Sequence, residues 1–419
     1  MTLSPPAFSP GAGSSSLSWQ ALGLEQELAG MLPELIQLRR HLHRHPELSG
    51  HEQQTAALVA GELRRWGWQV REGVGRTGVV AELGPATTPA GDPSPLVALR
   101  VDMDALPVEE RTGLDYASTV QGLMHACGHD LHTGVGLGVA WLLSAVARHH
   151  PEHLRSRVRL LFQPAEETAQ GAAWMKADGA TDGVEALFGL HVFPSIPVGC
   201  IGVRSGSLTA AAGELEVEVL GEGGHGARPH QSTDAIWIAA RVVSGLQETI
   251  SRRLDALHPV VVSFGRIEGG KAFNVIADHV RLLGTVRCLD NDVHAQLPGW
   301  IEETVHALCR GHGGEARVRY RCISPPVQND PVLTQLVAAA GCELLGSEQV
   351  LWLEQPSLGA EDFAELLDGT RGTMFRLGVA GPGGCTPLHS NTFAPDEGAL
   401  AVGVRVLTLS LLRWMEQPR

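Results

Sequence analysis

The chain has 419 residues, of which 43% are hydrophobic and 19% are charged. This length exceeds what one hydrophobic core usually organises, so we expect more than one globular domain. The net charge of -14 disfavours nucleic acids and anionic membranes as partners, because both are bound by basic surfaces.

The N-terminal segment is rich in Pro, Gly and Ser, and we predict that residues 1–17 are disordered. It lacks the basic and apolar regions of a signal peptide, and we find no apolar run long enough to span a bilayer. The seven cysteines are odd in number and include no C-x-x-C pair, which favours reduced thiols. We therefore expect a cytoplasmic protein.

Helical and strand patterns alternate along the first half of the chain. We predict helices over residues 22–45 and 131–149, and strands over residues 95–102, 158–162 and 186–192. Gly134, Gly136 and Gly138 should let the second helix pack closely. The alternation predicts an α/β fold with a mainly parallel sheet and helices on both faces.

The pattern changes after about Ser207. Residues 214–220 alternate polar and apolar side chains, as in a strand with one exposed face. A helix, two strands, a helix and a strand follow, over residues 234–253, 260–267, 279–287, 293–310 and 316–321. This βαββαβ order predicts helices packed on a small antiparallel sheet.

The α/β pattern then returns, with a helix from about residue 332, a strand at 373–377 and a last helix from 397. We therefore expect that residues 209–321 form a domain inserted into a larger one, made of residues 18–208 and 322–419.

The densest group of polar residues is M-H-A-C-G-H-D-L-H-T, residues 124–133. It lies between a strand and a helix, where α/β sheets place their sites. Gly128 lets the backbone turn so that Cys127 and His129 can face one point, and thiolate and imidazole are good ligands for a divalent metal. For any single histidine, a packed or hydrogen-bonded side chain is the better interpretation. The density of the group favours a metal site.

A second motif, Q-P-A-E-E-T at residues 163–168, directly follows a predicted strand. Glu166 and Glu167 are adjacent and cannot point the same way, so one can bind metal while the other transfers protons. The alternative is a helix N-terminus, where acidic side chains favour the macrodipole.

Further candidate residues are weaker when each is taken alone. His191 ends a hydrophobic strand and His389 lies in a Gly-rich loop, and either could be a packed histidine. In the inserted domain, G-E-G-G-H-G-A-R-P-H places His225, Arg228 and His230 where they could donate to an anion or form a solvated turn. Asn274 begins an apolar strand, as a structural hydrogen-bonding residue or a substrate contact. G-A-E-D-F, at 359–363, adds an acidic pair.

Taken in order, these motifs resemble the aminoacylase and carboxypeptidase-G group of di-metal peptidases. The similar branch contains hippurate hydrolases, N-acyl-amino-acid amidohydrolases and plant auxin-conjugate hydrolases. The resemblance runs from about residue 38 to about residue 400, through R-V-D-M-D-A-L-P, M-H-A-C-G-H-D, Q-P-A-E-E, G-L-H-V, G-G-H-G-A-R-P-H, N-V-I, G-A-E-D-F and L-H-S-N-T-F. Other branches have His at the position of Asp102 and Asp at the position of Cys127, so their ligands are not carried over.

The resemblance implies a role for each motif residue. Cys127 would bridge two divalent ions, Zn, Mn or Co, with His129 and His191 on one and Glu167 and His389 on the other. Glu166 would be the general base, and Asp104 would support the ligands. His225 would stabilise the oxyanion, in some relatives at a neighbouring subunit's site, while Asn274 and Arg228 would contact substrate.

The expected function is metal-dependent hydrolysis of N-acyl-L-amino acids, of the N-acetyl or N-benzoyl type. The inserted domain would act as a lid and would carry dimerisation, in a homodimer or homotetramer. The alternatives are a dipeptidase or carboxypeptidase, a biosynthetic deacetylase, or a non-catalytic metal-binding protein. Glu166 argues against the last.

Overall fold

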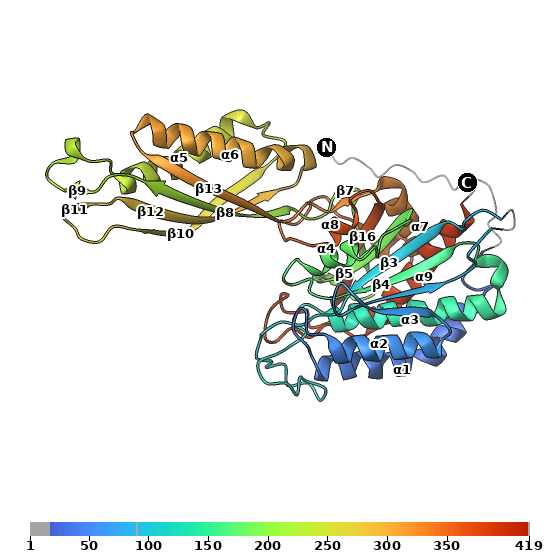
Figure 1. Cartoon of the computed structure of the whole chain (residues 1–419). Helices are drawn as coiled ribbons and strands as arrows, with labels where there is room; N and C mark the ends of the chain where they lie inside the picture. The colour runs from blue at the N-terminus through green and yellow to red at the C-terminus, as the bar shows by residue number, and fades with distance from the viewer. Residues whose placement is uncertain (1–16, 89–90, 418–419) are drawn as a thin grey trace.

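The computed structural model describes residues 17–88 and 91–417, which form a large α/β domain and a long arm (Figure 1). Most of the segment predicted to be disordered lies outside the described residues. Leu17, its last residue, is buried in the large core, so the prediction of disorder is wrong there.

An eight-stranded sheet forms the centre of the large domain. Its strands are β1 Gln69–Val74, β2 Gly78–Leu83, β3 Leu96–Asp102, β4 Arg157–Gln163, β5 Ala186–Pro197, β6 Ile201–Val203, β15 Val350–Trp352 and β16 Arg371–Ala380. They lie in the order β1-β2-β4-β3-β5-β16-β6-β15. The central strands β4, β3, β5 and β16 are parallel to one another, while β1–β2, β2–β4 and β6–β16 pair antiparallel. The predicted mainly parallel sheet is confirmed.

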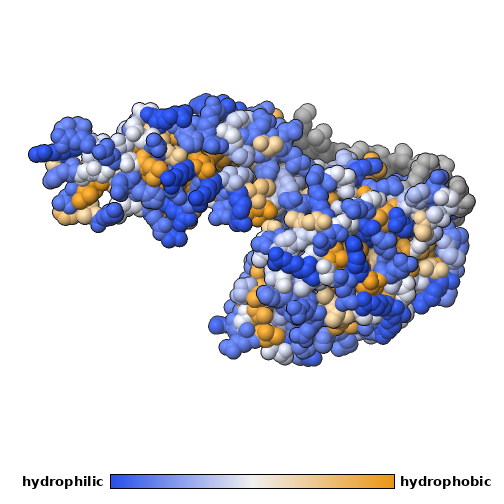
Figure 2. Space-filling view, in the orientation of Figure 1, coloured by the Kyte–Doolittle hydropathy of each residue, from blue (hydrophilic) through white to orange (hydrophobic). Residues whose placement is uncertain are grey.

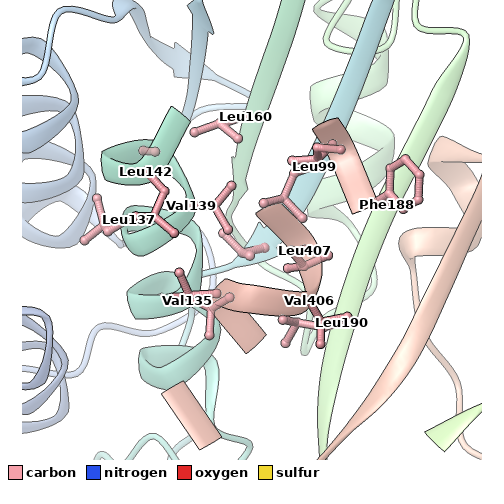
Figure 3. Close-up of a cluster of buried hydrophobic side chains, with 14 of the residues drawn as sticks. Leu99, Val135, Leu137, Val139, Leu142, Leu160, Phe188, Leu190, Val406 and Leu407 are labelled. Atoms are coloured by element: carbon pink, nitrogen blue, oxygen red, sulfur yellow. The ribbon is translucent and has the colours of Figure 1, made fainter. Parts of the chain in front are cut away.

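Helices cover both faces of this sheet, but unequally. The larger layer contains α1 Leu24–Arg44, α2 Gln53–Arg65, α3 His129–His149, α7 Pro331–Leu345 and α9 Gly398–Glu416. The opposite face carries the short helices α4 Gly171–Ala177 and α8 Phe363–Leu366. All seven residues of β3 are buried, as expected for a strand covered on both faces. Leu99, Leu160, Phe188 and Leu190 pack from the strands against α3 and α9 (Figure 3).

Two helices of this layer, α3 and α9, are long and apolar enough to cross a membrane by length and composition alone. This differs from our expectation that the chain contains no such run. Within the fold, 89% of the apolar window of α3 and 83% of that of α9 are buried. The two helices pack on each other and on the sheet, so core packing accounts for their hydrophobicity (Figure 3).

The arm is built on a four-stranded antiparallel sheet in the order β10-β12-β8-β13. Its elements are β8 Ala211–Leu220, β9 Gly224–His225, α5 Ala235–Arg253, β10 Val260–Gly269, β11 Val275–Ile276, β12 His279–Cys288, α6 Asn291–Gly311 and β13 Glu315–Ser324. Alternate residues of β8 are buried, and with α5 and α6 they form a separate hydrophobic core. The predicted βαββαβ order is the order observed.

Two chain segments join the arm to the large domain. β7 Gly206–Ser207 pairs with β14 Gln328–Asn329 at this junction, and the Leu208 amide donates to the Val327 carbonyl. The surface is indented between the arm and the large domain (Figure 2). The remaining elements are the 3-10 turns at Pro151–His153, Pro229–Gln231 and Ser347–Gln349.

Candidate metal centre and substrate cavity

Polar side chains occupy one face of the central strands, at the level where β3 and β4 end. They are Arg100 and Asp102 on β3, Gln163 on β4, His191 on β5 and Arg376 on β16, and all are buried. Because side chains alternate between the faces of a strand, their immediate neighbours enter the core with α3 and α9. The sheet thus carries an apolar face and a face that ends in ionisable groups.

Three predicted ligands meet where β5 approaches the N-terminus of α3. The ligand atoms of Cys127, His129 and His191 lie within 4.8 Å of one another, and Cys127 Sγ is 3.5 Å from His191 Nε2. Gly128, between the first two, has φ 82°, and a Cβ there would lie 2.7 Å from a methyl group of Val192. Glycine is therefore required for the turn that presents both side chains.

A second group shares Cys127. The ligand atoms of Cys127, Glu167 and His389 also lie within 4.8 Å of one another, with His389 Nε2 3.4 Å from Glu167 Oε1. His389 has a left-handed backbone with φ 65°, and its amide donates to the Ala126 carbonyl at 2.8 Å. This hydrogen bond ties the C-terminal loop to the turn that carries Cys127.

Asp104 holds both groups in place. Its backbone carbonyl and carboxylate lie 2.9 and 3.2 Å from His129 Nδ1, so this nitrogen carries the proton and Nε2 is the free ligand atom. The other carboxylate oxygen accepts hydrogen bonds from the Ser49 hydroxyl and the Glu167 amide. Burial alone would raise the pKa of Asp104, but the hydrogen bond from His129 and the other bonds outweigh it and lower the pKa.

The unpartnered atoms and their spacing fit bound metal ions. His129 Nε2 and Glu167 Oε1 are buried without a hydrogen-bond partner and lie 3.9 Å apart. Two atoms that bind the same tetrahedral ion at about 2.0–2.3 Å lie roughly 3.3–3.8 Å apart. The Cys127–His191 and His389–Glu167 distances of 3.5 and 3.4 Å agree with this spacing. Two cations that share the thiolate are therefore compatible with the donor set.

Nearby carboxylates are already engaged by protein groups. Arg100 contacts Asp102, Glu361 and Asp362 at 2.8–3.0 Å. Asp102 also lies 2.5 Å from His132 Nδ1. His132 Nε2 accepts the Val192 amide, so its proton must be on Nδ1. Asp102 and His132 also lie close together, but their polar atoms already contact other groups of the protein. We therefore assign them the role of positioning the backbone beside His191.

Glu166 lies at the edge of both groups and lines the cavity. Its Oε2 is 3.9 Å from His129 Nε2, and its side chain is 10% exposed. Burial raises the pKa of Glu166 well above its ordinary value, and the negative charges of Glu361 and Asp362 raise it further. A carboxyl group in this position can hold a proton more readily than one in water.

A cavity of about 600 Å³ opens beside these residues. Its floor contains Cys127, His191 and the carboxylates, and the base of the arm contributes Thr209, Arg321 and Ile323. The cavity therefore lies where the arm joins the large domain, and a substrate bound there would contact both.

The three residues predicted on the arm are not brought to this cavity. His225 and Asn274 neighbour each other, since His225 pairs with Val275 across β9–β11, and Arg228 follows closely. All three are exposed. β9 and β11 lie at the tip of the arm, the part farthest from the large sheet (Figure 1). In this arrangement they cannot act on the cavity of their own chain.

Two buried arginines near the site were missed from the sequence, Arg100 behind the cavity carboxylates and Arg376 in the cavity wall. Each interrupts an apolar strand, in L-V-A-L-R-V and M-F-R-L-G. A charged residue at one position of a fully buried strand must meet a partner inside the protein, and this signal could have identified both.

Known proteins share both the sequence and the fold. A profile of peptidase family M20/M25/M40 matches residues 98–413. A protein of Synechocystis sp. strain PCC 6803, named Probable hydrolase, is 52% identical over 387 residues, covering 92% of this chain and 96% of that protein. The N-acetyl-L-cysteine deacetylase of Bacillus subtilis is 39% identical over 374 residues, covering 89% and 86%. The crystal structure of a dinuclear metal-binding M20 peptidase from Bacillus subtilis has a TM-score of 0.80 and 33% identity, covering 93% of this chain and all of that one. These similarities span the large domain and the arm.

Proposed function

Because the chain belongs to peptidase family M20/M25/M40, a family of metal-dependent hydrolases of amide and peptide bonds, we propose that it hydrolyses N-acyl-L-amino acids. The products would be a carboxylic acid and a free amino acid. The N-acetyl-L-cysteine deacetylase relative supports an N-acetyl substrate, and we propose N-benzoyl amino acids as the other candidate class. The runner-up activities are those of a dipeptidase or carboxypeptidase and of a biosynthetic deacetylase.

We assign the metal ligands by the two clusters that share a thiolate. Cys127, His129 and His191 would hold one divalent ion, and Cys127, Glu167 and His389 the other. Zn, Mn and Co all suit this mixture of sulfur, nitrogen and oxygen donors. When bound, the ions supply Lewis-acid activation of water and of the amide carbonyl.

Glu166 is the proposed proton carrier. It takes a proton from the attacking water and delivers it to the amine nitrogen that leaves. Its raised pKa, caused by burial and by the neighbouring carboxylates, favours a group that can hold that proton between the two steps. Asp104 keeps His129 in one tautomer, and His132 with Asp102 holds the backbone beside His191.

The observation that carries this assignment is the pair of clusters with Glu166 beside them. Five side chains from distant parts of the chain converge with their ligand atoms close together, and two of those atoms, His129 Nε2 and Glu167 Oε1, are buried without a partner. A purely structural metal site would need only the five ligands. It would not need an additional side chain, the Glu166 carboxylate, that can take up a proton and that lines a cavity.

His225, Asn274 and Arg228 would complete the site from a second subunit. We propose a homodimer or homotetramer that is assembled through the arm, because most of the exposed large hydrophobic residues lie there, Trp237, Ile267 and Phe273 among them. His225 of the partner subunit would donate to the oxyanion, which at comparable sites stabilises the transition state by about 3 kcal/mol. Asn274 and Arg228 of the partner subunit would bind the substrate. All seven cysteines are free, which is compatible with the cytoplasmic location that we propose.

The test is a substrate panel on protein reconstituted with Zn, Mn or Co. We expect hydrolysis of N-acetyl and N-benzoyl amino acids, measured as released amine, with two metal ions per chain. Preferential cleavage of dipeptides with a free amino end would favour the dipeptidase. Failure to cleave any substrate with any metal would refute the proposal.

A further inference from the structure

Arg376 is a buried cation in the wall of the substrate cavity. It lies on β16 directly opposite His191 of β5, and it lines the cavity together with Cys127 and His191. Its exposure is only 6%. A positive charge therefore sits beside the proposed metal ligands, where two divalent cations would increase its repulsion.

The other buried arginines all have carboxylate partners. Arg39 contacts Asp130 and Glu397, and Arg159 contacts Glu82. Arg100 contacts three carboxylates at 3.0 Å or less. Across residues 17–88 and 91–417, Arg376 is the one buried arginine that forms no ion pair, since no carboxylate oxygen lies within 4.0 Å of its guanidinium.

Arg376 has few protein partners of any kind. Its Nη2 donates to the Ser357 hydroxyl at 3.1 Å, and its guanidinium lies 4.9 Å from the centre of the Phe193 ring. A guanidinium has five N–H donors, so most of them are left for a molecule in the cavity. A buried charge without a paired anion is costly. Because no carboxylate of the chain pairs with Arg376, an anion bound in the cavity would account for the presence of this arginine.

Ser357 is held rigidly next to the guanidinium. Its amide donates to the Leu208 carbonyl at 3.0 Å, and the residue forms a β-bridge with Thr209. Phe193, Ile323 and Leu388 add apolar surface to the same cavity. A fixed hydroxyl, a planar cation and apolar walls are suited to a carboxylate on a short carbon chain.

We propose that Arg376, supported by Ser357, binds a carboxylate of the substrate and makes the enzyme select anionic over neutral amides. This inference rests on the proposed function and specifies its substrate class. Arg376 is thus a specificity-determining residue on the large domain, separate from the contacts proposed for the partner's arm. The carboxylate can belong to the amino acid backbone, to its side chain, or to the acyl group.

Three pairs of substrates distinguish these sources, each pair differing by one carboxylate and its amide. They are N-acetyl-L-methionine and its carboxamide, N-acetyl-L-glutamate and N-acetyl-L-glutamine, and N-succinyl-L-methionine and its succinamide analogue. In the wild-type holoenzyme we expect at least one pair to show a kcat/KM preference for the carboxylate on the order of 10²-fold. The pair with the largest preference identifies the source.

The variants Arg376→Met, Arg376→Lys and Ser357→Ala then test the residue. Arg376→Met should reduce the preference in that pair to within about threefold, chiefly through KM, while Arg376→Lys should keep part of it because the charge remains. Arg371→Met is the matched control. Arg371 lies on the same strand but is exposed, pairs with Asp330 and does not line the cavity, so its loss should leave the preference unchanged.

Metal content and thermal midpoint separate recognition from a structural role. If Arg376→Met lowers metal per chain, or lowers kcat/KM equally for both members of every pair, Arg376 acts on the centre itself and the inference is wrong. If wild type shows no carboxylate preference in any pair, the inference also fails. Absence of hydrolysis of all six compounds by wild type would instead count against the proposed function.

Discussion

Hydrogen bonds from neighbouring groups decide which ring nitrogen of a histidine is free to bind metal. His129 shows this most clearly, because the Asp104 carbonyl and carboxylate occupy its Nδ1 and leave Nε2 for a metal. His132 is oriented in the opposite sense, since its Nε2 accepts a backbone amide and its Nδ1 faces Asp102. Two neighbouring histidines of one helix turn therefore have different roles, one as a ligand and one as a support.

Glu166→Gln should abolish turnover without loss of metal. The amide cannot accept the proton of the attacking water, so we expect kcat to fall by about 10³-fold or more, with two metal ions still bound. Steady-state kinetics and elemental analysis measure these effects. Glu348→Gln, at an exposed position that does not line the cavity, is the control and should match wild type. Full activity of Glu166→Gln would remove the glutamate from the mechanism.

Metal affinity should fall as the solution becomes more acidic. Burial raises the pKa of the Cys127 thiol, and the nearby Glu167 carboxylate raises the pKa of His389. Both protons must leave before metal binds, so protons compete at a higher pH than they would for free side chains. Chelator competition between about pH 6 and 8 should show weakening affinity toward pH 6. Cys127→Ala should lose bound metal at every pH, whereas Cys342→Ala, at an exposed position, should not. A flat profile would contradict the assignment.

Residue types and order identified the five proposed ligands, but not what each side chain contacts. Cys127 and His129 share one turn, so local sequence sufficed for them. His389 comes to the site through a left-handed backbone and a hydrogen bond to Ala126, and neither is visible in the sequence. Arg376 was missed because its partner is not a nearby residue of the chain, and a strand pattern alone does not show what fills a cavity.

At the level of elements, glycines determine how closely α3 packs. A Cβ at Gly138 would lie 2.4 Å from a methyl group of Val404 on α9 and 3.0 Å from one of Leu35 on α1. The predicted close packing of this helix is thus observed. The three helices form one layer because glycine lets the neighbouring side chains approach the α3 backbone.

Gly138→Ala should destabilise the protein by about 1–3 kcal/mol through overpacking. The matched control is Gly61→Ala on the exposed side of α2, where a Cβ would meet nothing within 4 Å. There alanine should stabilise by about 0.5–1 kcal/mol, because it favours the helix more than glycine does. Urea unfolding of the two variants measures the contrast, and equal effects would show that packing at α3 is not limiting.

The contact between α1 and α3 should depend on pH. Burial alone would lower the pKa of His43, but Asp130 and Glu110 outweigh it and raise the pKa above the ordinary value of 6.5. A raised pKa in the folded state means that this stabilisation is complete below pH 6.5 and is lost as pH rises through the higher value. His43→Gln should therefore cost about 1–3 kcal/mol at acidic pH and less at alkaline pH.

Urea unfolding of metal-free wild type and His43→Gln at about pH 6 and pH 9 tests this difference. Using metal-free protein keeps the pH dependence of metal binding out of the comparison. If the stability lost in His43→Gln grew with pH instead, the assigned direction of the His43 pKa shift would be wrong.

Most helices and strands were predictable because their apolar residues repeat with a clear period. The remaining elements were missed because their apolar repeat is weak. The helix predicted over residues 22–45 is α1 Leu24–Arg44, and the strand at 260–267 is β10 Val260–Gly269. α2, β1, β2 and α4 were not assigned individually. β1 is largely exposed, and α4 has only seven residues, so neither offers a clear apolar repeat.

At the scale of the whole molecule, the arm separates residues that are expected to act together. His225 lies at the tip of the arm, while Glu166 lies in the cavity of the large domain. No sequence pattern could reveal this separation, because both motifs match the same family. If His225 acts at the metal centre, as we propose, it must come from a second subunit.

Subunit mixing tests this arrangement. His225→Ala and Glu166→Gln should each be inactive alone, yet a mixed dimer contains one site with an intact Glu166 and the partner's intact His225. Randomly exchanged subunits should therefore recover about a quarter of wild-type activity. Size-exclusion chromatography and a tag on each variant confirm that mixed dimers form. Mixed dimers without activity, or full activity in His225→Ala alone, would contradict action across subunits.

The proposed ligands lie on both sides of the arm in the chain, and His389 follows all the others. During translation the ribosome releases the N-terminal part first, with four of the five ligands, and that part can begin to fold early. The loop with His389 must then emerge and dock on the Ala126 carbonyl before the last ligand is in place. A growing polypeptide therefore carries an unfinished centre until synthesis is nearly over, so hydrolysis cannot begin while the protein is still being made.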